Sequence, residues 1–344
     1  MSALSTLMSL DPAIAASAPS PSLNAAEPNS LAILCSDLVG RLSSSSVVRS
    51  LEPMARRTTL RVGGPADLYV EPATEEDLAA TLAFCKQRHL RHMILGRGSN
   101  LLVRDGGIRG AVICLAGPAF ARLEVDGTRL RCGAGVRLKH LAVEARRSGL
   151  AGLEFLEGIP GSLGGALRMN AGAMGSATFE VVESLRFMDA LGRVGECTAA
   201  DAHPRYRSCP MLIENIALGA VLRGAPSAEQ AIRERMDAFS RRRWDTQPHD
   251  PSAGCMFKNP STVPAGKLVE ELGLKGLRRG GALVSTVHAN FIVNDGKAKA
   301  ADVLALIEFV RAHARAERGI ELETEVEIIG EDDVAGGGPA TEHS

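Results

Sequence analysis

The sequence lacks the features that would direct it to a membrane or a nucleic acid. Its 39 Lys and Arg residues balance 40 Asp and Glu residues, so the net charge of −1 favours neither nucleic acids nor anionic surfaces. It contains no run of about 18 apolar residues, so no membrane span is expected. No lysine or arginine precedes Arg41, which argues against a secretory signal. These absences favour a cytoplasmic protein.

The cysteines show neither a disulfide framework nor a metal-binding pattern. None of the seven forms a C-x-x-C pair, and no group of Cys and His residues has zinc-finger spacing. His288, in the stretch VSTVHANFIVN, has no carboxylate or cysteine partner at a useful spacing, so no metal site is expected. An odd, scattered set of cysteines is typical of reduced thiols in the cytosol, most of which fill space in the core.

Composition separates two tails from an ordered centre. Residues 1–30 are rich in Ala, Ser and Pro and are expected to be a disordered tail, with a degenerate targeting peptide as the alternative. Residues 332–344 (DDVAGGGPATEHS) are expected to form a loose tail at the other end. The chain between the tails is long enough for two or three domains, and we expect two α+β halves.

Local signals predict short strands that alternate with helices. Thr74 is expected to cap a helix whose first turn is acidic, and Asp126-Gly127 is expected to form the turn of a β-hairpin. Strands are expected at 60–70, 92–95, 101–104, 123–125, 129–131, 183–189, 194–198, 290–293 and 320–329. Further helices are expected at 138–148, at 227–244 with Ser227 as its cap, at 265–272 and at 300–316. The four glutamates of the last strand would share one face, because strand side chains alternate.

Two glycine-rich stretches are candidates for binding a phosphate or a ring system. In GRGSN, residues 96–100, two glycines would let backbone N–H groups converge, while Ser99 and Asn100 add donors; a plain turn is the alternative. The stretch is neither a Walker loop nor a dinucleotide fingerprint, because it lacks Gly-Lys-Ser/Thr and no helix follows it. Residues 158–173 contain five glycines, which is poor for any regular element and suits backbone that approaches a ligand closely. A structural loop remains the alternative here.

Three kinds of side chain are chemical candidates, and each also has an ordinary structural explanation. Cys255, in SAGCMFKNP, would be mostly protonated at its usual pKa of about 8.5 and could donate a proton, although most free cysteines only pack. Arg207 could stabilise a developing enolate or be a surface residue. One glutamate of the last strand could be a buried catalytic carboxylate, although such a row of glutamates normally forms a solvated face.

Taken together, these stretches resemble one family, the UDP-N-acetylenolpyruvoylglucosamine reductases (MurB). The resemblance runs from Thr58 to Gly330 and covers most of the expected ordered chain. The matching motifs are TTLRVGGPADL, LGRGSNLLVRDGGIRG, GLEFLEGIPGSLGGALRMNAGA, YRS, SAGCMFKNP, AGKLVEELGLKG, VSTVHANFIVN and LETEVEIIG. The unbroken spacing between them is similar to the shorter (type II-like) form of the family, which lacks an extra substrate-gating insertion.

The resemblance implies a fold and a domain order. The fold is α+β, with a two-part FAD-binding domain of the vanillyl-alcohol-oxidase (PCMH) type followed by a smaller α+β substrate-binding domain. On this basis we expect FAD-binding subdomains at 31–117 and 118–225 and a substrate-binding domain at 226–331. FAD would be held non-covalently.

The resemblance also implies a reaction and its partners. NADPH reduces FAD, and the enolpyruvyl ether of UDP-N-acetylglucosamine is then reduced to UDP-N-acetylmuramate for peptidoglycan synthesis. The partners are therefore this substrate and NADPH, with no nucleic acid and no membrane insertion; the oligomeric state is open, with a monomer expected. One alternative is a sugar or hydroxy-acid dehydrogenase or oxidase of the same flavin fold. Another is a non-catalytic flavoprotein.

The family's functional residues fall on definite positions of this sequence. Arg207 is implied to hold the substrate carboxylate and the enolate charge, Glu325 to stabilise the intermediate, and Cys255 to occupy the place of the proton donor. The candidates for contact with FAD are Gly96, Arg97, Gly98, Ser99, Asn100, Leu101, Gly158, Ile159, Pro160, Gly161, Ser162, Gly164, Gly165, Asn170, Ala171 and Gly172. The candidates for contact with the substrate are Tyr206, Lys258 and Asn259.

Cys255 departs from the family's usual pattern, in which the donor is the second serine of SAGS-x-F-K. A thiol gives up a proton more readily than a hydroxyl, so we expect a conservative replacement; loss of function is the alternative. An exposed catalytic thiol would also be open to oxidation and alkylation.

Overall fold

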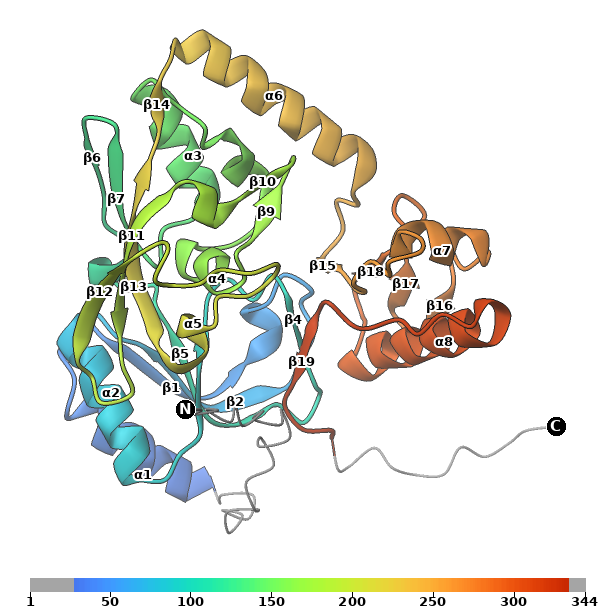
Figure 1. Ribbon diagram of the computed structural model, residues 1–344. Coiled ribbons are helices and arrows are strands. Elements are labelled where there is room, and N and C mark those ends of the chain that lie inside the picture. The colour runs from blue at the N-terminus through green and yellow to red at the C-terminus, as the bar shows by residue number, and fades with distance from the viewer. Residues whose placement is uncertain (1–27, 334–344) are drawn as a thin grey trace, which may run out of the picture.

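The computed structural model describes residues 28–333, and the predicted tails at 1–30 and 332–344 lie almost wholly outside this range. Helices and strands are mixed throughout, which confirms the predicted α+β class. Figure 1 shows the C-terminal part of the chain, in orange and red, beside a larger body formed by the preceding residues. None of the helices between residues 28 and 333 is long and apolar enough to cross a membrane.

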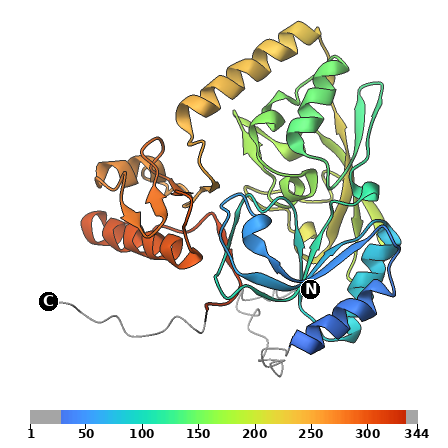
Figure 2. The ribbon, with the colours of Figure 1, turned by 180° about the vertical axis from the view of Figure 1, so that it is seen from behind.

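The two faces of the first sheet pack into two separate buried clusters. Its strands, in spatial order, are β1 (Val47–Pro53), β2 (Pro65–Glu71), β5 (Ile108–Cys114) and β3 (His92–Leu95). β1 is antiparallel to β2, and the other three strands are parallel. Leu68 and Phe84 are buried where α1 (Pro28–Val39) and α2 (Glu75–Gln87) cover one face, on the side away from the C-terminal part (Figure 2). Tyr69 belongs to a separate buried cluster, because successive strand side chains point to opposite faces.

Side-chain capping explains why α2 begins where the sequence predicts. The hydroxyl oxygen of Thr74 accepts a hydrogen bond from the N–H of Asp77 at 3.1 Å, and Oδ2 of Asp77 accepts one from the N–H of Thr74 at 3.2 Å. This reciprocal pair is a capping box. The same carboxylate also accepts hydrogen bonds from Ser43 and Ser46, so it ties the α1–β1 connection to the helix. The predicted cap is confirmed.

The second sheet is wholly antiparallel. Its strands, in spatial order, are β12 (Val194–Thr198), β11 (Val182–Met188), β13 (Ile216–Arg223), β7 (Arg129–Gly133) and β6 (Leu123–Asp126). The predicted hairpin between β6 and β7 is confirmed, and Gly127 in its turn has a φ of 58°, which glycine adopts without steric cost. Buried side chains of α3 (Leu138–Arg147) and α4 (Leu163–Arg168) share one cluster with this sheet.

Short elements complete the first two thirds of the chain. They are β4 (Leu101–Val103), β8 (Leu150–Ala151), β9 (Gly172–Ala173), β10 (Ser176–Ala177), β14 (Ala225–Pro226), α5 (Met211–Glu214) and the 3₁₀ turns at Met54–Arg56, Pro118–Phe120, Glu154–Gly158 and Thr178–Glu180. β8 pairs with β14, and β9 pairs with β10.

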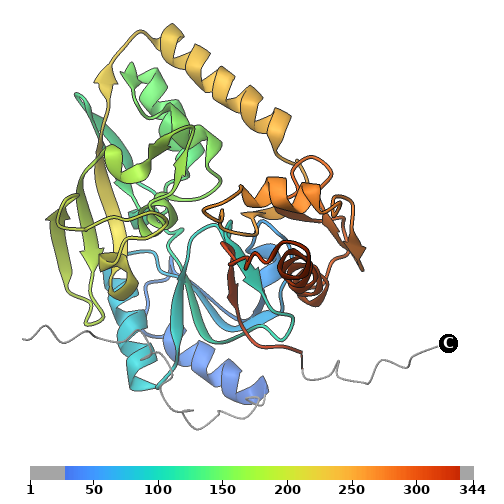
Figure 3. The ribbon, with the colours of Figure 1, turned by 45° about the vertical axis from the view of Figure 1, so that its right-hand side comes forward.

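The C-terminal part has its own sheet and core. The helix α6 (Glu229–Thr246) crosses from the second sheet to this part (Figure 1). The strands of the sheet, in spatial order, are β15 (Ser252–Cys255), β18 (Phe291–Asn294), β17 (Ala282–Val284) and β16 (Arg278–Arg279). The helices α7 (Ala265–Glu271) and α8 (Ala300–Arg318) share a buried cluster with the sheet, and Figure 3 brings both helices forward.

The end of the chain returns to the first two thirds. The strand β19 (Glu327–Ile329) pairs in parallel with β4, where Glu327 lies opposite Leu101. The carboxylate of Asp105, just beyond β4, accepts hydrogen bonds from the N–H groups of Ala300 and Ala301 at 2.9 Å each. These two donors have no partner within α8, so Asp105 caps a helix of the C-terminal part. Together these contacts fix the two parts against each other.

The prediction that residues 158–173 form no regular element is wrong. Residues 163–168 form α4, and the segment Glu154–Gly158 before it is a 3₁₀ turn. Leu163, Ala166 and Leu167 have the helical spacing i, i+3, i+4, and all three are buried in one cluster. Burial of this face outweighs the low helix propensity of the two glycines between them.

The last predicted strand is also wrong in its extent. Only Glu327–Ile329 is a strand, and the residues before it are irregular. Glu321 and Glu323 each pair with a basic side chain at the surface, whereas the side chain of Glu325 is only 13 % exposed. The four glutamates therefore do not form one solvated face.

Two boundaries differ from their predictions. Ser227 does not cap α6: its N–H donates to the carbonyl of Gly149, because the short strand just before it pairs with β8. The strand predicted to begin at residue 60 begins at Pro65. The carbonyls of Leu60 and Arg61 accept hydrogen bonds from the Asn294 side chain instead of a neighbouring strand.

Candidate active site

The two predicted glycine-rich loops meet each other. The hydroxyl of Ser99 donates a hydrogen bond to the carbonyl of Pro160 at 2.7 Å. A Cβ atom placed on Gly96 would lie 2.9 Å from Oγ of Ser162, closer than real Cβ contacts. A side chain at residue 96 would therefore force Ser162 to move, at the place where the loop from the first sheet touches the loop beside the second sheet. The sequence predicted that both loops bind one ligand, and their contact makes this possible.

The first glycine-rich loop, residues 96–100, is also fixed by the segment that contains Arg57 and Thr59. Gly98 has a φ of 60°, and a Cβ atom there would lie 2.5 Å from the carbonyl oxygen of Arg57. The N–H of Thr59 donates to the carbonyl of Gly98 at 3.2 Å, and its hydroxyl donates to the carbonyl of Ser252 at 2.7 Å. One residue therefore links the glycine loop to the strand that ends at Cys255.

A basic cavity of about 240 Å³ opens between the loops. The basic residues among those that line it are Arg97, Arg137, Lys139 and Arg243. Its one acidic residue, Glu157, pairs with Lys139 at 3.3 Å. Several cations beside a glycine-rich loop are what a diphosphate requires. The residues present therefore fit the diphosphate of the expected FAD.

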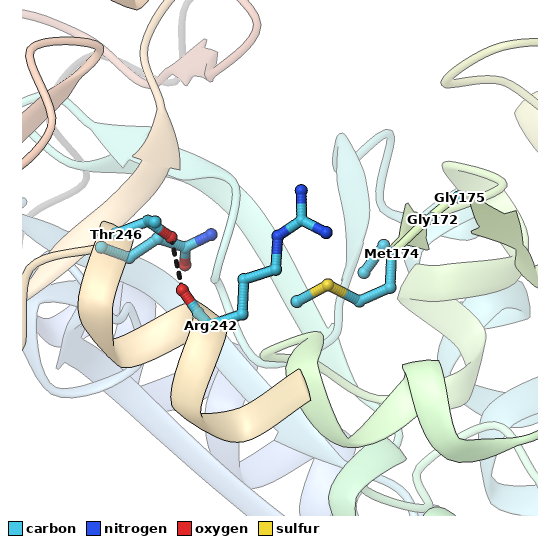
Figure 4. A pocket seen from close by; sticks show the side chains of 7 residues that line it. Gly172, Met174, Gly175, Arg242 and Thr246 are labelled. Carbon is cyan, nitrogen blue, oxygen red and sulfur yellow. Dashed lines mark hydrogen bonds between the residues drawn. The ribbon is translucent and has the colours of Figure 1, made fainter. Parts of the chain in front are cut away.

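A second cavity, of about 550 Å³, lies between β9 and the end of α6. Figure 4 shows the Arg242 side chain extending from α6 toward Met174, beside Gly172 and Gly175. The sequence assigned no role to residues 241–248. A run of three arginines at the end of a helix was the available signal, but it did not tell which surface the helix end would face.

The end of α6 also contacts the second glycine-rich stretch directly. Nη1 of Arg243 donates to the carbonyl of Gly158 at 2.8 Å, and burial lowers the pKa of this arginine. The neighbouring Trp244 stacks on His249 with ring centroids 4.2 Å apart. Arg243 and Trp244 both line the basic cavity, so α6 closes one of its sides.

The structure brings Arg207 and Glu325 together. Nε of Arg207 lies 2.8 Å from Oε1 of Glu325. The distance suits a hydrogen bond, but the N–H is not directed at the oxygen, so the contact is an ion pair. Arg207 has a φ of 54°, between two hydrogen bonds that join Arg205 and Ser208. A non-glycine residue rarely adopts this conformation, and here it turns the guanidinium toward Glu325.

Backbone and side-chain contacts fix Glu325. Its N–H donates to the carbonyl of Met256 at 2.8 Å, and its carbonyl accepts from Nδ2 of Asn100 at 3.1 Å. Burial raises the pKa of its carboxyl group, against the opposite effect of the positive charges of Arg207 and Lys258. Burial favours the neutral form of this carboxyl group and the two positive charges favour its ionised form. A charged ligand that binds beside it can therefore change its protonation.

Cys255 is partly buried near this pair. Burial, together with the negative charge of Glu325, raises the pKa of its thiol to about 11, against the opposite effect of Arg207. The thiol is therefore protonated at neutral pH and is a weak nucleophile. The thiol is half-buried rather than fully exposed, and its oxidation and alkylation, which require the thiolate, stay a prediction.

The side-chain amides predicted to contact FAD are used within the protein. Asn100 donates to Glu325, as described, and Nδ2 of Asn170 donates to the carbonyl of Arg205 at 3.1 Å. Oδ1 of Asn170 accepts from the N–H of Phe179 at 3.2 Å. Both asparagines therefore connect a glycine-rich segment to a segment that carries Glu325 or Arg207.

The three residues predicted to contact the substrate differ in whether their side chains already have partners within the protein. Tyr206 is 75 % exposed, and its ring centroid lies 5.7 Å from Cζ of Arg207. Nζ of Lys258 pairs with Glu323 at 2.9 Å at the surface. Oδ1 of Asn259 accepts the N–H of Ala265 at 3.0 Å, so it satisfies the first turn of α7. Tyr206 is therefore the most accessible of the three to a ligand.

Residues 28–333 contain no group of three or more His, Cys, Asp and Glu side chains that could hold a metal ion.

Comparisons with known proteins cover both parts of the chain. Residues 66–198 match the family model of an FAD binding domain, and residues 247–329 match that of the UDP-N-acetylenolpyruvoylglucosamine reductase C-terminal domain. The reductase of that name from Heliobacterium modesticaldum is 46 % identical over 299 residues, 85 % of this chain and 94 % of that protein. The one from Clostridioides difficile is 43 % identical, over 82 % of this chain and 93 % of that protein.

A solved structure agrees with these sequences. The crystal structure of UDP-N-acetylenolpyruvylglucosamine reductase (MurB) from Thermus caldophilus superposes with a TM-score of 0.71 at 37 % identity. The similarity covers 82 % of this chain and 98 % of that one.

Proposed function

Since this chain belongs to the UDP-N-acetylenolpyruvoylglucosamine reductase (MurB) family, we propose that Arg207, Glu325 and Cys255 perform its reaction. The protein is an FAD-dependent oxidoreductase, a UDP-N-acetylmuramate dehydrogenase. It uses NADPH to reduce UDP-N-acetylglucosamine enolpyruvate to UDP-N-acetylmuramate in peptidoglycan synthesis. When bound, FAD supplies the hydride that adds to the terminal carbon of the enolpyruvyl alkene.

Arg207 binds and orients the substrate carboxylate in this proposal. Addition of a hydride to the alkene leaves negative charge on the adjacent carbon and on the carboxylate, in the form of an enolate. A planar guanidinium can bind both oxygens of a carboxylate and stabilises the added charge. The unusual backbone of Arg207 and its short distance to Glu325 support the idea that this guanidinium is held in place for a ligand.

Glu325 acts as a protonated carboxyl group. Its burial favours the neutral form, which can donate a hydrogen bond to an enolate oxygen. In the free protein, the positive charge of Arg207 favours the ionised form of Glu325. When a substrate carboxylate binds Arg207, this charge is shared between two anions and favours the ionised form less. The substrate therefore helps to create the protonated group that stabilises its own intermediate.

Cys255 completes the reduction. Its S–H bond breaks as a C–H bond forms at the carbon next to the substrate carboxylate, and the resulting thiolate takes a proton from solvent. A pKa of about 11 keeps the thiol protonated before this step. The same value makes reprotonation at neutral pH favourable.

The observation that carries this proposal is the meeting of separate segments at one place. Arg207 follows the second glycine-rich stretch, Cys255 ends β15, and Glu325 precedes β19, yet the charges of the arginine and the glutamate both act on the thiol. The bond from Asn100 to Glu325 joins the same group to the first glycine-rich loop. This bond supports the proposal that hydride transfer from FAD and proton transfer from Cys255 take place side by side.

The test is a spectroscopic titration without oxygen. The purified protein should show the absorption of bound FAD, NADPH should bleach it, and UDP-N-acetylglucosamine enolpyruvate should restore it with formation of UDP-N-acetylmuramate. Rapid oxidase or dehydrogenase turnover on free sugars or hydroxy acids, without restoration by the enolpyruvyl sugar, would favour the other enzymes of this fold. Flavin that NADPH cannot bleach would favour a non-catalytic flavoprotein.

Two further assignments belong to this proposal. The seven cysteines are free thiols, and NADPH is the reductant, so we place the reaction in the cytoplasm. Contact of Tyr206, Lys258 and Asn259 with the UDP-sugar is proposed because the first lies beside Arg207 and the charge of the second reaches Glu325.

A further inference from the structure

Asn290 lies immediately before β18 and is only 3 % exposed. Its side chain binds the backbone of Phe257 at both ends: Oδ1 accepts from the N–H at 2.9 Å, and Nδ2 donates to the carbonyl at 2.8 Å. Its own carbonyl accepts from the N–H of Met256 at 2.8 Å. One buried residue thus satisfies three backbone groups of the segment that follows Cys255.

The regular sheet ends where these bonds begin. Cys255 lies opposite Phe291 in the last pair between β15 and β18, and the register shifts within β15, where Gly254 has a φ of 79°. Beyond Cys255, a carboxamide offers Phe257 the same donor and acceptor that a neighbouring strand would offer. The side chain of Asn290 therefore replaces a backbone partner at a place where the ladder has none.

The segment held in this way binds the residues around Glu325. The carbonyl of Met256 accepts the N–H of Glu325 at 2.8 Å, and the N–H of Lys258 donates to the carbonyl of Glu323 at 2.9 Å. Phe257 also forms an isolated bridge with Thr324. Asn290 is therefore bonded to the short segment that begins directly after Cys255 and runs alongside Glu325.

The backbone N–H and the side-chain carboxamide of Asn290 are both fixed in orientation. Its backbone N–H donates to Nδ1 of His288 at 3.2 Å. Burial lowers the pKa of His288, which favours a neutral ring whose Nδ1 can accept. The two bonds to Phe257 leave one orientation of the carboxamide, because its oxygen must face an N–H and its nitrogen a carbonyl.

We propose that Asn290 is a positioning residue for the proton-transfer step. It touches neither substrate nor cofactor in this proposal, which rests on the proposed function. It acts through the backbone at residues 256 and 257, and so sets where the Cys255 thiol lies relative to Glu325. A displacement of about 1 Å at a reacting group can cost about a hundredfold in rate, so loss of the two amide bonds should slow proton transfer strongly.

Asn290→Asp is the most informative change. An ionised aspartate keeps the acceptor for the N–H of Phe257 but sets a negative oxygen against its carbonyl, whereas a protonated aspartate restores the donor. At a mildly alkaline pH we expect bleaching by NADPH within about twofold of the parent, and reoxidation by the enolpyruvyl sugar slowed by about tenfold to a hundredfold. Reoxidation should recover relative to the parent as the pH falls and the introduced carboxylate gains its proton.

Ser285→Ala is the matched control. Ser285 is also 3 % exposed and lies in the same turn, where its hydroxyl oxygen accepts from the N–H groups of Val287 and His288 at 3.1 and 3.4 Å. Neither of these bonds reaches residues 255–258. We expect this change to lower the thermal unfolding temperature but to leave both half-reactions near those of the parent.

The outcomes separate the two proposals. If the enolpyruvyl sugar does not reoxidise the parent protein, the proposed function is wrong. If it reoxidises the parent and Asn290→Asp alike, or if Ser285→Ala is slowed as much as Asn290→Asp, the role of Asn290 is overturned. Should Asn290→Asp not fold, Asn290→Ser replaces it: slow reoxidation with normal bleaching at every pH supports the role, and normal reoxidation overturns it.

Discussion

Arg207 and Glu325 neutralise each other across 2.8 Å in the free protein. The guanidinium N–H is not aligned with the carboxylate, so this pair lacks the strong charge-assisted hydrogen bonds that a bidentate partner would form. A substrate carboxylate can supply them. Substrate binding is therefore expected to exchange one carboxylate for another at Arg207, and to change the charge around Glu325 and Cys255 at the same time.

The role of Cys255 is tested by two substitutions. Cys255→Ala removes the acidic hydrogen, so reoxidation by the enolpyruvyl sugar should fall by about a hundredfold or more, while NADPH bleaches the flavin normally. Cys255→Ser keeps a donor and should retain substantial activity. Stopped-flow measurement of both half-reactions gives the answer, and normal turnover of Cys255→Ala would exclude the thiol as the acid.

The thiol should be slow to react at neutral pH, and Glu325 should be one reason. The negative charge of Glu325 raises the pKa of Cys255, so Glu325→Gln should lower it. Alkylation of Cys255 by iodoacetamide, followed by mass spectrometry of the labelled peptide, should then begin at a lower pH than in the parent. Alkylation that begins at the same or a higher pH would show that the two groups do not interact in this way.

Gly98 should be needed for FAD binding. Gly98→Ala would set a Cβ atom 2.5 Å from the carbonyl oxygen of Arg57 and should displace the loop, weakening FAD binding by about tenfold or more, or about 1.4 kcal/mol. Gly127→Ala is the matched control, because Gly127 has nearly the same φ but its Cβ would meet open space. It should cost about 1 to 2 kcal/mol of backbone strain and leave FAD binding unchanged. Fluorescence titration of the apoprotein with FAD distinguishes the two, and equal affinities would contradict the prediction.

Thr59 should couple the first glycine-rich loop, residues 96–100, to β15, the strand that ends at Cys255. Thr59→Val keeps the shape but removes the hydroxyl that donates to Ser252, so the free energy of unfolding should fall by about 1 kcal/mol. Thr198→Val removes an exposed hydroxyl bond to Asp201 and serves as the control. Unfolding in urea with and without FAD should show a smaller stabilisation by FAD in Thr59→Val only. The same stabilisation in both variants would argue against the coupling.

The parts of the fold that depend on local chemistry could be predicted from the sequence. Thr74 and Asp77 lie three residues apart and satisfy each other, so their helix begins where expected. Asp126-Gly127 determines its turn in the same way, since only the two turn residues have to suit the conformation. Local patterns offered Arg207, Cys255 and one glutamate only as candidates, and the resemblance to a known family then selected Glu325 and implied a role for each.

The parts that depend on distant partners could not be predicted in this way. The many glycines in residues 158–173 argued against a helix, yet residues 163–168 form α4. This helix is stabilised by burial against the second sheet, which its own composition does not reveal. The alternating glutamates suggested a strand, but three of the four pair with different basic side chains, and the partner of Glu325 is an arginine from another part of the chain. The bond of Asn100 to Glu325 and the position of Arg242 beside a cavity likewise follow from how separate segments pack.

The pairing of β19 with β4 has a consequence for how the protein matures. During synthesis the glycine-rich loops, Arg207 and Cys255 all leave the ribosome before Glu325, which precedes the last strand. A nascent or truncated chain without this strand would hold the residues proposed to bind FAD while the proposed proton-transfer group lacked Glu325. Glu325 therefore reaches its place beside Arg207 only when the C-terminal part has folded back and β19 has paired with β4.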